Sequence, residues 1–298
     1  MSKNELVPWS KATSNDVPDF LRGKERHTFE SVNPERKYDI YRIAQALSDV
    51  VTENQVPQGN LYETIERVPL GTERHIVIFE KRLIRKKMNP KGVSVACSGW
   101  GLDPQTRKGG TGRIRMYNKD DIPTEDLEAW GIPLDAPAEG VIEKFCDECP
   151  FSSWRREEGK NIPPACNFVH EIFFLDIENG FDRVPKKIEI AETNSETRKS
   201  ARVLDNLVQR NLRNKNLPDI AGVFLLKTKR VENAEGKKYF VFDFDFVGVI
   251  SDEKLYDAVE YCYSTFRDIR LKEDDDEKER SENENPWDEE VNEDIPWK

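Results

Sequence analysis

The sequence predicts an α+β fold in which β-strands dominate, and three observations lead to it. Runs rich in β-branched and aromatic residues, bounded by turn residues, recur over 61–88, 168–177 and 223–250. One segment, 195–214, instead has apolar residues at helical spacing. The last 26 residues are too acidic to build a core. We therefore expect a flexible arm at 1–35, a folded core at 36–272 and a disordered acidic tail at 273–298.

The first elements are expected to be an extended arm, a helix and then strands. Three prolines interrupt the arm, and its aromatic residues Trp9, Phe20 and Phe29 could dock on the core or on a neighbouring copy. Residues 38–52 place Tyr41, Ala44 and Leu47 at helical spacing, which predicts a short helix. Strands then follow over 61–88, and the most β-rich part is 72–79.

The middle of the chain is expected to be irregular. Residues 97–170 are rich in Gly, Pro, Cys and Trp and show little periodicity, so this subdomain needs its own source of order. A strand is predicted at 168–177. Thr193 and Glu196 then fit a capping box, which predicts that Thr193 is the N-cap of the 195–214 helix.

The last elements are expected to be a hairpin and a helix. Residues 223–230 and 239–250 flank Glu235-Gly236, a turn signal. Phe240, Phe242, Phe244 and Phe246 share one face of the second strand by its period of two, and we expect this row to lie in the core. Residues 254–270 predict a helix with Leu255, Ala258, Val259, Cys262 and Phe266 inward.

Charge is distributed unevenly along the chain. The tail holds 13 acidic and three basic residues, which leaves 44 acidic and 43 basic residues in 1–272. A basic face can therefore exist on the folded part despite the overall net charge of −11. No apolar run approaches the length of a membrane span, and the N-terminus lacks a signal-peptide pattern. We expect a cytoplasmic protein with no membrane partner, whose five cysteines are reduced.

Four cysteines form a candidate structural Zn²⁺ site. Cys146 and Cys149 make a C-x2-C knuckle, Cys166 follows 17 residues later, and Cys97 lies upstream. Four thiolates are a common tetrahedral zinc ligand set. His170 is the rival to Cys97 as fourth ligand. The alternative is unligated thiols and no metal.

Basic residues interleaved with glycine and aromatic residues form a candidate nucleic-acid interface. Arg and Lys neutralise phosphates, and aromatic faces stack on bases. The candidate DNA-binding residues are Lys86, Lys87, Trp100, Arg107, Lys108, Arg113, Arg115, Tyr117, Arg198 and Arg202. Trp130 and Trp154 are further stacking candidates, although we expect Trp154 to pack against the knuckle.

Evidence for an enzyme is weak. Gly109-Gly110-Thr111-Gly112 lacks the Lys-Ser/Thr that completes a phosphate loop. Asp243 and Asp245, with Asp176 or Glu192, are the one candidate nuclease metal site. We therefore expect no catalytic activity.

The tail tip resembles that of bacterial single-stranded-DNA-binding proteins, which end in Asp-Asp-Asp-Ile-Pro-Phe. Here Asp294, Ile295, Pro296 and Trp297 match, with Trp in place of Phe and Lys298 after it. The resemblance implies that these four residues bind replication and recombination proteins, and that the acidic run competes with DNA.

A second resemblance, over roughly 38–250, is to a recurring type of uncharacterised phage protein. It rests on Cys97-Ser98, on Cys146-x2-Cys149-Pro150-Phe151-Ser152-x-Trp154 and on Pro163-Pro164-Ala165-Cys166. The overall plan is also similar to the T4-type phage single-stranded-DNA-binding protein, which has an arm, a zinc-containing core and an acidic tail. These resemblances imply an OB-like core with a zinc insertion at 97–170. They also imply single-stranded DNA as partner, bound without sequence preference, and possible self-association on DNA. The rivals are a zinc-containing adaptor that binds a host polymerase and a metal-dependent nuclease.

Overall fold

A computed structural model describes most of the folded part of the chain. The described residues are 19–21, 39–46, 48–52, 56–64, 67–88, 95–157, 159–178, 184–233 and 236–265. The strands are β1 (Asp39–Ile43), β2 (Leu61–Glu63), β3 (Pro69–Gly71), β4 (Glu73–Met88), β5 (Val95–Leu102), β6 (Gly109–Arg115), β7 (Val141–Phe145), β8 (Arg155–Glu157), β9 (Lys160–Ile162), β10 (Asn167–Asp176), β11 (Lys186–Ala191), β12 (Gly222–Glu232) and β13 (Lys238–Val249). The α-helices are α1 (Asp49–Thr52), α2 (Thr124–Ala129), α3 (Ser195–Asn211) and a helix at 253–265; the 3-10 helices are η3 (Asp19–Leu21), η4 (Met116–Asp121), η5 (Arg213–Lys215) and η6 (Asp219–Ala221).

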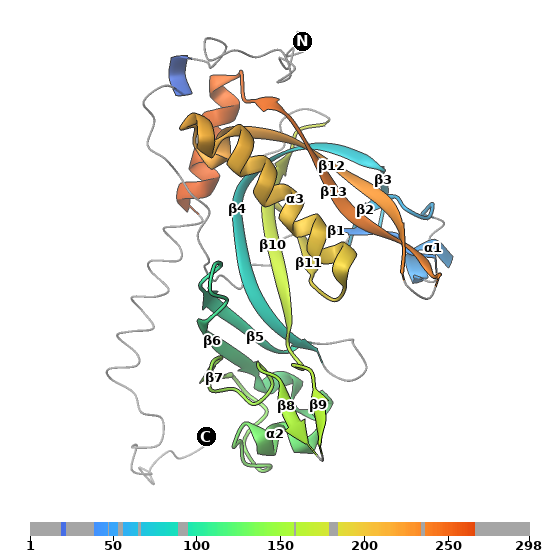
Figure 1. Cartoon of the computed structure of the whole chain (residues 1–298), viewed down its shortest axis with the longest axis vertical. Coiled ribbons are helices and arrows are strands. Elements are labelled where there is room, and N and C mark those ends of the chain that lie inside the picture. The colour runs from blue at the N-terminus through green and yellow to red at the C-terminus, as the bar shows by residue number, and fades with distance from the viewer. Residues whose placement is uncertain are drawn as a thin grey trace, which may run out of the picture.

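Strand β4 organises the sheet (Figure 1). The strand order is β3-β2-β1-β11-β10-β4-β5-β6-β7, with β12 paired to both β4 and β13. β10 pairs with β4 over most of its length, β12 pairs with its first residues, and β5 pairs with its last. The pairs are antiparallel except β1 with β11. β4 and β10 therefore run through two parts of the molecule: a larger part with α3, and a smaller part with β5–β9 and α2.

Each part has its own hydrophobic core. In the larger part, Ile76 to Phe79 on β4 are all fully buried, so both faces of the sheet are covered there. Phe173, Phe224 and Leu204 complete this core together with β10, β12 and α3. In the smaller part, the core comprises Ala96, Cys97, Ile114, Met116, Ile122, Leu127, Trp130, Ile132 and Phe151.

The sequence predicted the fold class and several elements correctly. The protein is a β-rich α+β protein with a mixed sheet, and β10, α3 and the β12–β13 hairpin lie where expected. Two predictions were wrong. Residues 97–170 are not irregular, because three paired strands and the second core order them. Residues 39–43 form a strand instead of a helix, because they pair with β2 and β11, and tertiary pairing outweighs local periodicity.

The cap of α3 lies one residue beyond the expected position. Asn194, and not Thr193, is the N-cap: its side chain accepts hydrogen bonds from the backbone N–H groups of Glu196 and Thr197. Thr197, and not Glu196, returns a bond to the N-cap backbone. Asn is at least as good an N-cap residue as Thr, so the sequence contains two adjacent candidates for the N-cap, Thr193 and Asn194.

The ends of the chain are described only in part. Phe20 packs against Tyr256 of the 253–265 helix, with ring centroids 5.7 Å apart, so this part of the arm docks on the core as expected. Tyr256, Val259 and Tyr263 are the buried residues of that helix. The rest of the arm and the tail, including Asp294, Ile295, Pro296 and Trp297, lie outside the described residues. Within the described residues, no helix combines the length and apolarity that a membrane crossing requires.

The phenylalanine row of β13 is only partly in the core. Phe244 is fully buried, whereas Phe240, Phe242 and Phe246 are half-buried and pack against the core. Partial exposure of Phe240 and Phe242 matters because both reach the groove described below.

Candidate metal centre and nucleic-acid groove

The four predicted ligand cysteines lie in one neighbourhood of the smaller part. Cys97 is on β5, Cys146 and Cys149 follow β7, and Cys166 precedes β10. Cys97 belongs to the core of the smaller part, and Cys149 and Cys166 pack against that core. Burial raises the pKa of Cys97, and negative charge on any of the other three thiols would raise it further. Burial likewise raises the pKa of Cys146 to about 11 and that of Cys166 to about 12.

Two paired glycines make room for these thiols. Gly99 on β5 lies directly opposite Gly112 on β6. A Cβ atom on Gly99 would collide with the Sγ atom of Cys146. A Cβ atom on Gly112 would lie 3.1 Å from the Sγ atom of Cys97 and 3.5 Å from that of Cys146. The missing side chains therefore form a recess in the sheet for two of the sulfur atoms.

The donor set fits a zinc ion, although the sulfur atoms are not arranged as a closed site. Among the described residues, no group of three or more Cys, His, Asp or Glu side chains is placed to hold a metal ion. Closing the site requires the four sulfur atoms to converge within about 2.3 Å of one point. His170 is held elsewhere, since its Nε2 atom lies 2.7 Å from Glu192 Oε1. Cys97 is thus a better fourth donor than His170.

Aromatic rings next to the knuckle are structural. The Trp130 Nε1–H donates a hydrogen bond to Cys149 Sγ at 3.4 Å, and its ring meets Phe151 edge-on. Trp130 is buried, so it offers no face to a base. Trp154 was expected to pack against the knuckle, but this is wrong: 68% of its surface is exposed.

Most of the predicted DNA-binding residues bind other parts of the protein. Lys87 is buried, pairs with Asp126 and lies over the Phe151 ring. Trp100 is buried, and Arg113 and Arg115 lie over its ring. Arg113 also binds Glu143, and Arg115 binds Ser98. Lys108 and Arg202 are exposed. The side chain of Tyr117 lies outside what the structure describes.

Lys86 belongs to an ion-pair network across β4, β10 and β11. Glu171 is buried and lies 2.6 Å from Arg82, 2.9 Å from Lys187 and 3.4 Å from Lys86. Glu189 binds Lys86 and Lys187, each at 2.7 Å. Although burial opposes its charge, Glu171 has a lowered pKa because three cations surround it.

Glu192 joins the loop after β5 to the start of α3. Both guanidinium NH groups of Arg107 bind its carboxylate at 2.8 Å, His170 binds it at 2.7 Å, and Arg198 lies 3.4 Å away. The side chain of Glu192 is 2% exposed. Burial opposes its charge, but the His170 and Arg107 contacts lower its pKa to about 2. Of two further DNA-binding candidates, Arg107 therefore joins the smaller part to the larger one, whereas Arg198 pairs with Glu192 within the larger part.

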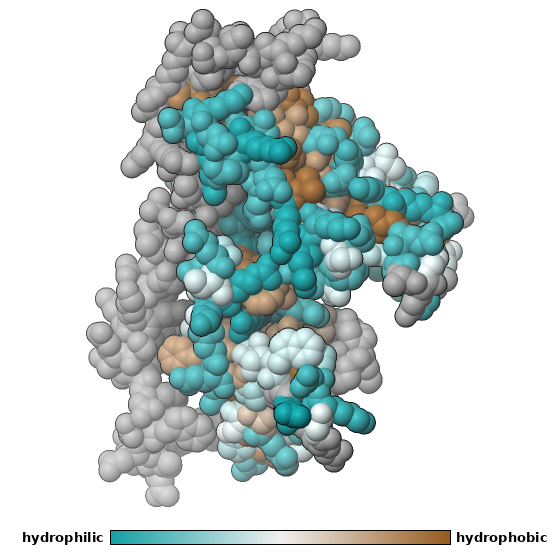
Figure 2. Space-filling view, in the orientation of Figure 1, coloured by the Kyte–Doolittle hydropathy of each residue, from teal (hydrophilic) through white to brown (hydrophobic). Residues whose placement is uncertain are grey.

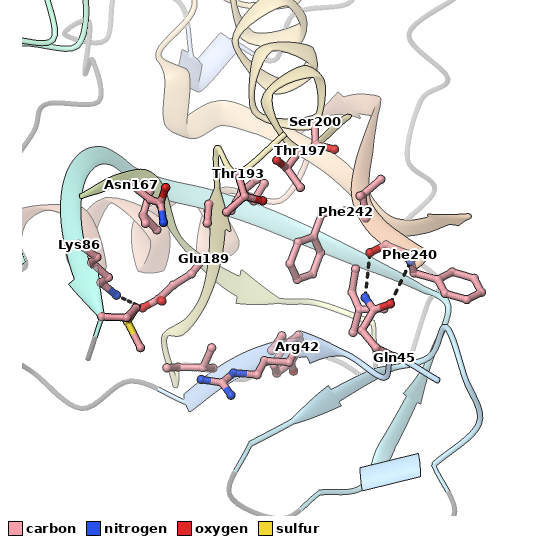
Figure 3. A pocket seen from close by; sticks show the side chains of 18 residues that line it. Arg42, Gln45, Lys86, Asn167, Glu189, Thr193, Thr197, Ser200, Phe240 and Phe242 are labelled. Atoms are coloured by element: carbon pink, nitrogen blue, oxygen red, sulfur yellow. Dashed lines mark hydrogen bonds and ion pairs between the residues drawn. The ribbon is translucent and has the colours of Figure 1, made fainter. Parts of the chain in front are cut away.

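A groove of 380 Å³ lies between β1, β11, β13 and the first turns of α3 (Figure 3). Its walls are mainly apolar, from Ile40, Val169, Ile190 and Phe242. Polar groups at its edge come from Arg42, Lys86, Glu189, Asn167 and Thr193. Arg42 is exposed, and no hydrogen bond or ion pair links its side chain to another described residue. Of these edge residues, only Lys86 was among the sequence candidates.

Gln45 and Gly59 fix the end of this groove. The Gln45 side-chain amide donates to the Phe240 carbonyl at 2.9 Å and accepts from the Phe240 N–H at 3.0 Å (Figure 3). Gly59 has φ +84°, and a Cβ atom there would lie 2.6 Å from the Phe240 ring. A glycine is thus required both by the backbone and by the ring.

A second hollow of 350 Å³ lies beside the first, between α3, β12 and β13. Ser200 and Val241 line both. The second hollow is lined by Lys199, Arg202 and Lys229, with Glu196 and Asp243 also present. Arg202 and Lys229 are exposed. The surrounding face is largely hydrophilic, with separate small hydrophobic groups (Figure 2).

The structure does not assemble the candidate nuclease site. Asp243 and Asp245 lie 3.7 Å and 2.5 Å from Lys227. Asp176 is buried against Tyr41 and Arg74 at 2.9 Å and 2.8 Å, and Glu192 lies in the junction described above.

Fold and site together define a β-rich α+β protein with an open groove and a buried thiol cluster. A family model described as "Pam3 phage gp34-like protein" matches residues 152–272. This range contains Cys166, β10, β11, α3, β12 and β13, and hence most of both hollows. No curated protein and no solved structure matches the chain. The similarity supports a phage protein, as the sequence resemblance implied, and carries no statement about DNA.

Proposed function

We propose that the protein is a phage single-stranded-DNA-binding protein that acts in replication or recombination and catalyses no reaction. The observation that carries the proposal is the pair of neighbouring hollows, with exposed Arg42 at the first and exposed Arg202 and Lys229 at the second. A strand of DNA needs a groove that its backbone can follow, cations for its phosphates and apolar surface for its bases. We propose that the strand follows this path, with the β-rich core in the role of an OB-like domain.

The basic residues that remain available favour modest, salt-dependent affinity. Of the sequence candidates, Lys108 and Arg202 are exposed, whereas Lys86, Lys87, Arg107 and Arg113 each bind a carboxylate of the protein itself. An internally paired cation releases fewer counterions on binding a phosphate. The strand contacts therefore come mainly from Arg42, Arg202 and Lys229.

We propose that Cys97, Cys146, Cys149 and Cys166 hold a structural Zn²⁺. A bound dication would stabilise thiolates that burial otherwise keeps protonated. It would also fix the ends of β5, β7 and β10 to one another. Support comes from the shared neighbourhood of the four thiols and from the Gly99–Gly112 recess.

The tail extends this proposal to partners. We propose that the acidic run at 273–298 competes with DNA for the two hollows, and that Asp294 to Trp297 bind replication or recombination proteins. The arm serves self-association on DNA.

Binding of a fluorescent oligo-dT tests the proposal. Full-length protein should bind it more tightly than duplex DNA, and a 1–272 truncation should bind more tightly still. Equal binding of duplex and single strand would remove the single-strand assignment. Absence of binding by both proteins would refute the proposal.

A zinc-containing adaptor is a second candidate, favoured by an exposed apolar group in the smaller part. Phe145 and Trp154, which flank the cysteine knuckle, are 67% and 68% exposed, and Val141 on the same edge strand is 40% exposed. Exposed aromatic residues are typical of protein interfaces. An adaptor bound to a host polymerase would lose this partner on Trp154→Ala and would bind no oligo-dT with or without its tail.

A further inference from the structure

The open edge of β13 carries an unused pair of backbone hydrogen-bonding groups inside the groove. Among the described strands, β13 pairs only with β12, and the ladder is regular at Phe240 and Phe242. Gln45 binds both the N–H and the C=O of Phe240, so these groups face away from β12. In an antiparallel ladder the same orientation recurs at every second residue. The N–H and C=O of Phe242 therefore face the groove.

Phe242 is the residue of this edge that lies open in the groove between two covered neighbours. Gln45 covers the edge at Phe240, and Phe244 is 1% exposed. A peptide that extends a sheet pairs through several consecutive residues. One N–H and one C=O instead match a small planar group with an adjacent acceptor and donor.

The Gln45 amide shows what such a group looks like. It is planar and presents one donor and one acceptor side by side, and it fills the edge at Phe240 with bonds of 2.9 Å and 3.0 Å. The unpaired edge of a nucleobase presents the same pattern: thymine N3–H donates, and its O4 or O2 accepts. The groove walls next to Phe242 are apolar, which suits the faces of a base.

We propose that the groove holds one unpaired nucleobase, bound by its donor–acceptor edge to the main chain of Phe242. The base N–H donates to the Phe242 carbonyl and the base carbonyl accepts from the Phe242 N–H. Arg42, exposed at the edge of the groove, neutralises the adjoining phosphate. This inference rests on the proposed single-strand binding and adds to it a site that reads bases.

The test compares oligo-dT with the same oligonucleotide built from N3-methylthymidine, by calorimetry with the full-length protein. Methylation removes the base donor but leaves the phosphates and ring in place. We expect about tenfold weaker binding, the factor that one hydrogen bond of ordinary strength supplies. Equal binding of both would overturn the base site and leave single-strand binding intact. Binding of neither would overturn the proposed function as well.

Two variants separate the main chain of Phe242 from its ring. Phe242→Pro removes the N–H, and because this N–H faces away from β12, the ladder is kept. Phe242→Ala removes the ring and keeps the N–H. The methylation effect should shrink in Phe242→Pro and persist in Phe242→Ala; the reverse result would assign recognition to the ring and overturn the proposal. If Phe242→Pro fails to fold, the methylation comparison on the unmodified protein decides alone.

Two further ligands identify the source of the base. Thymidine monophosphate should bind far more weakly than the oligonucleotide if the base belongs to a strand. Tight binding of the mononucleotide would support the base site and overturn the strand as its source. Binding of a short extended peptide in the groove, displaced by neither nucleotide, would overturn the base assignment.

Discussion

Glu192→Gln tests the junction between the two parts of the molecule. The substitution keeps the shape of the side chain and removes its charge, while Arg107 and His170 remain within hydrogen-bonding distance. The carboxyl pKa of about 2 lies below its usual value near 4.3. At about 1.4 kcal/mol for each pKa unit, the contacts stabilise the folded state by about 3 kcal/mol at pH 7.

The pH dependence gives this prediction its sign. A lowered folded-state pKa contributes stability that is present above the unfolded pKa and is lost as the pH falls through the folded pKa. Urea unfolding should therefore show a deficit of about 3 kcal/mol for Glu192→Gln at pH 7, which shrinks as the pH falls from about 4 to 2. Exposed Glu128→Gln is the matched control and should change little. A deficit below about 0.5 kcal/mol at pH 7, within the range of ordinary surface substitutions, would refute the reasoning.

Three more predictions follow from the described contacts. Gly99→Ala should destabilise the protein by about 1–3 kcal/mol in thermal or urea unfolding, because its methyl group displaces Cys146. It should also lower the bound zinc measured by elemental analysis. Unchanged stability would show that Gly99 is not needed to make room for the Cys146 sulfur. Gln45→Ala should lower the free energy of unfolding by about 1–2 kcal/mol, because two hydrogen bonds to the main chain of Phe240 are lost. A change near zero would show that these two hydrogen bonds do not stabilise the protein. Oligo-dT affinity should fall roughly 20-fold from 50 to 200 mM salt, because about three phosphates are contacted by Arg42, Arg202 and Lys229, and a flat salt titration would exclude this mode.

Sequence patterns predicted the elements whose stability is local. The 195–214 helix carries its own cap and apolar face, and the hairpin at 223–250 carries its own turn, so both were found. Strand β1 was missed because its partners lie about 20 and 147 residues away along the chain, in β2 and β11. Its helical spacing of apolar residues was incidental.

The candidate site was predictable in chemistry and less so in position. Cysteine spacing singled out four thiols that lie in one neighbourhood, and the contact of His170 with Glu192 leaves Cys97 as the better fourth donor. The DNA-binding residues were harder to predict, because a run of Lys and Arg in the sequence does not show which of them form ion pairs with Asp or Glu in the fold. Glu171 and Glu192 neutralise cations that looked available in the sequence. Nothing in the sequence around Arg42 indicates a binding role, because the groove forms only when β1, α3 and β13 come together in the fold.

Loss of oligo-dT affinity in groove variants tests the central claim most directly. Fluorescence anisotropy at 50 mM salt would compare the unmodified protein with an Arg42→Ala, Arg202→Ala double variant and with a Lys160→Ala, Lys254→Ala control. Both controls are exposed cations outside the two hollows. The account predicts that the groove variant binds at least tenfold more weakly, with a salt dependence smaller by about one to two contacts, while the control is nearly unchanged. Equal affinity of all three proteins would contradict it.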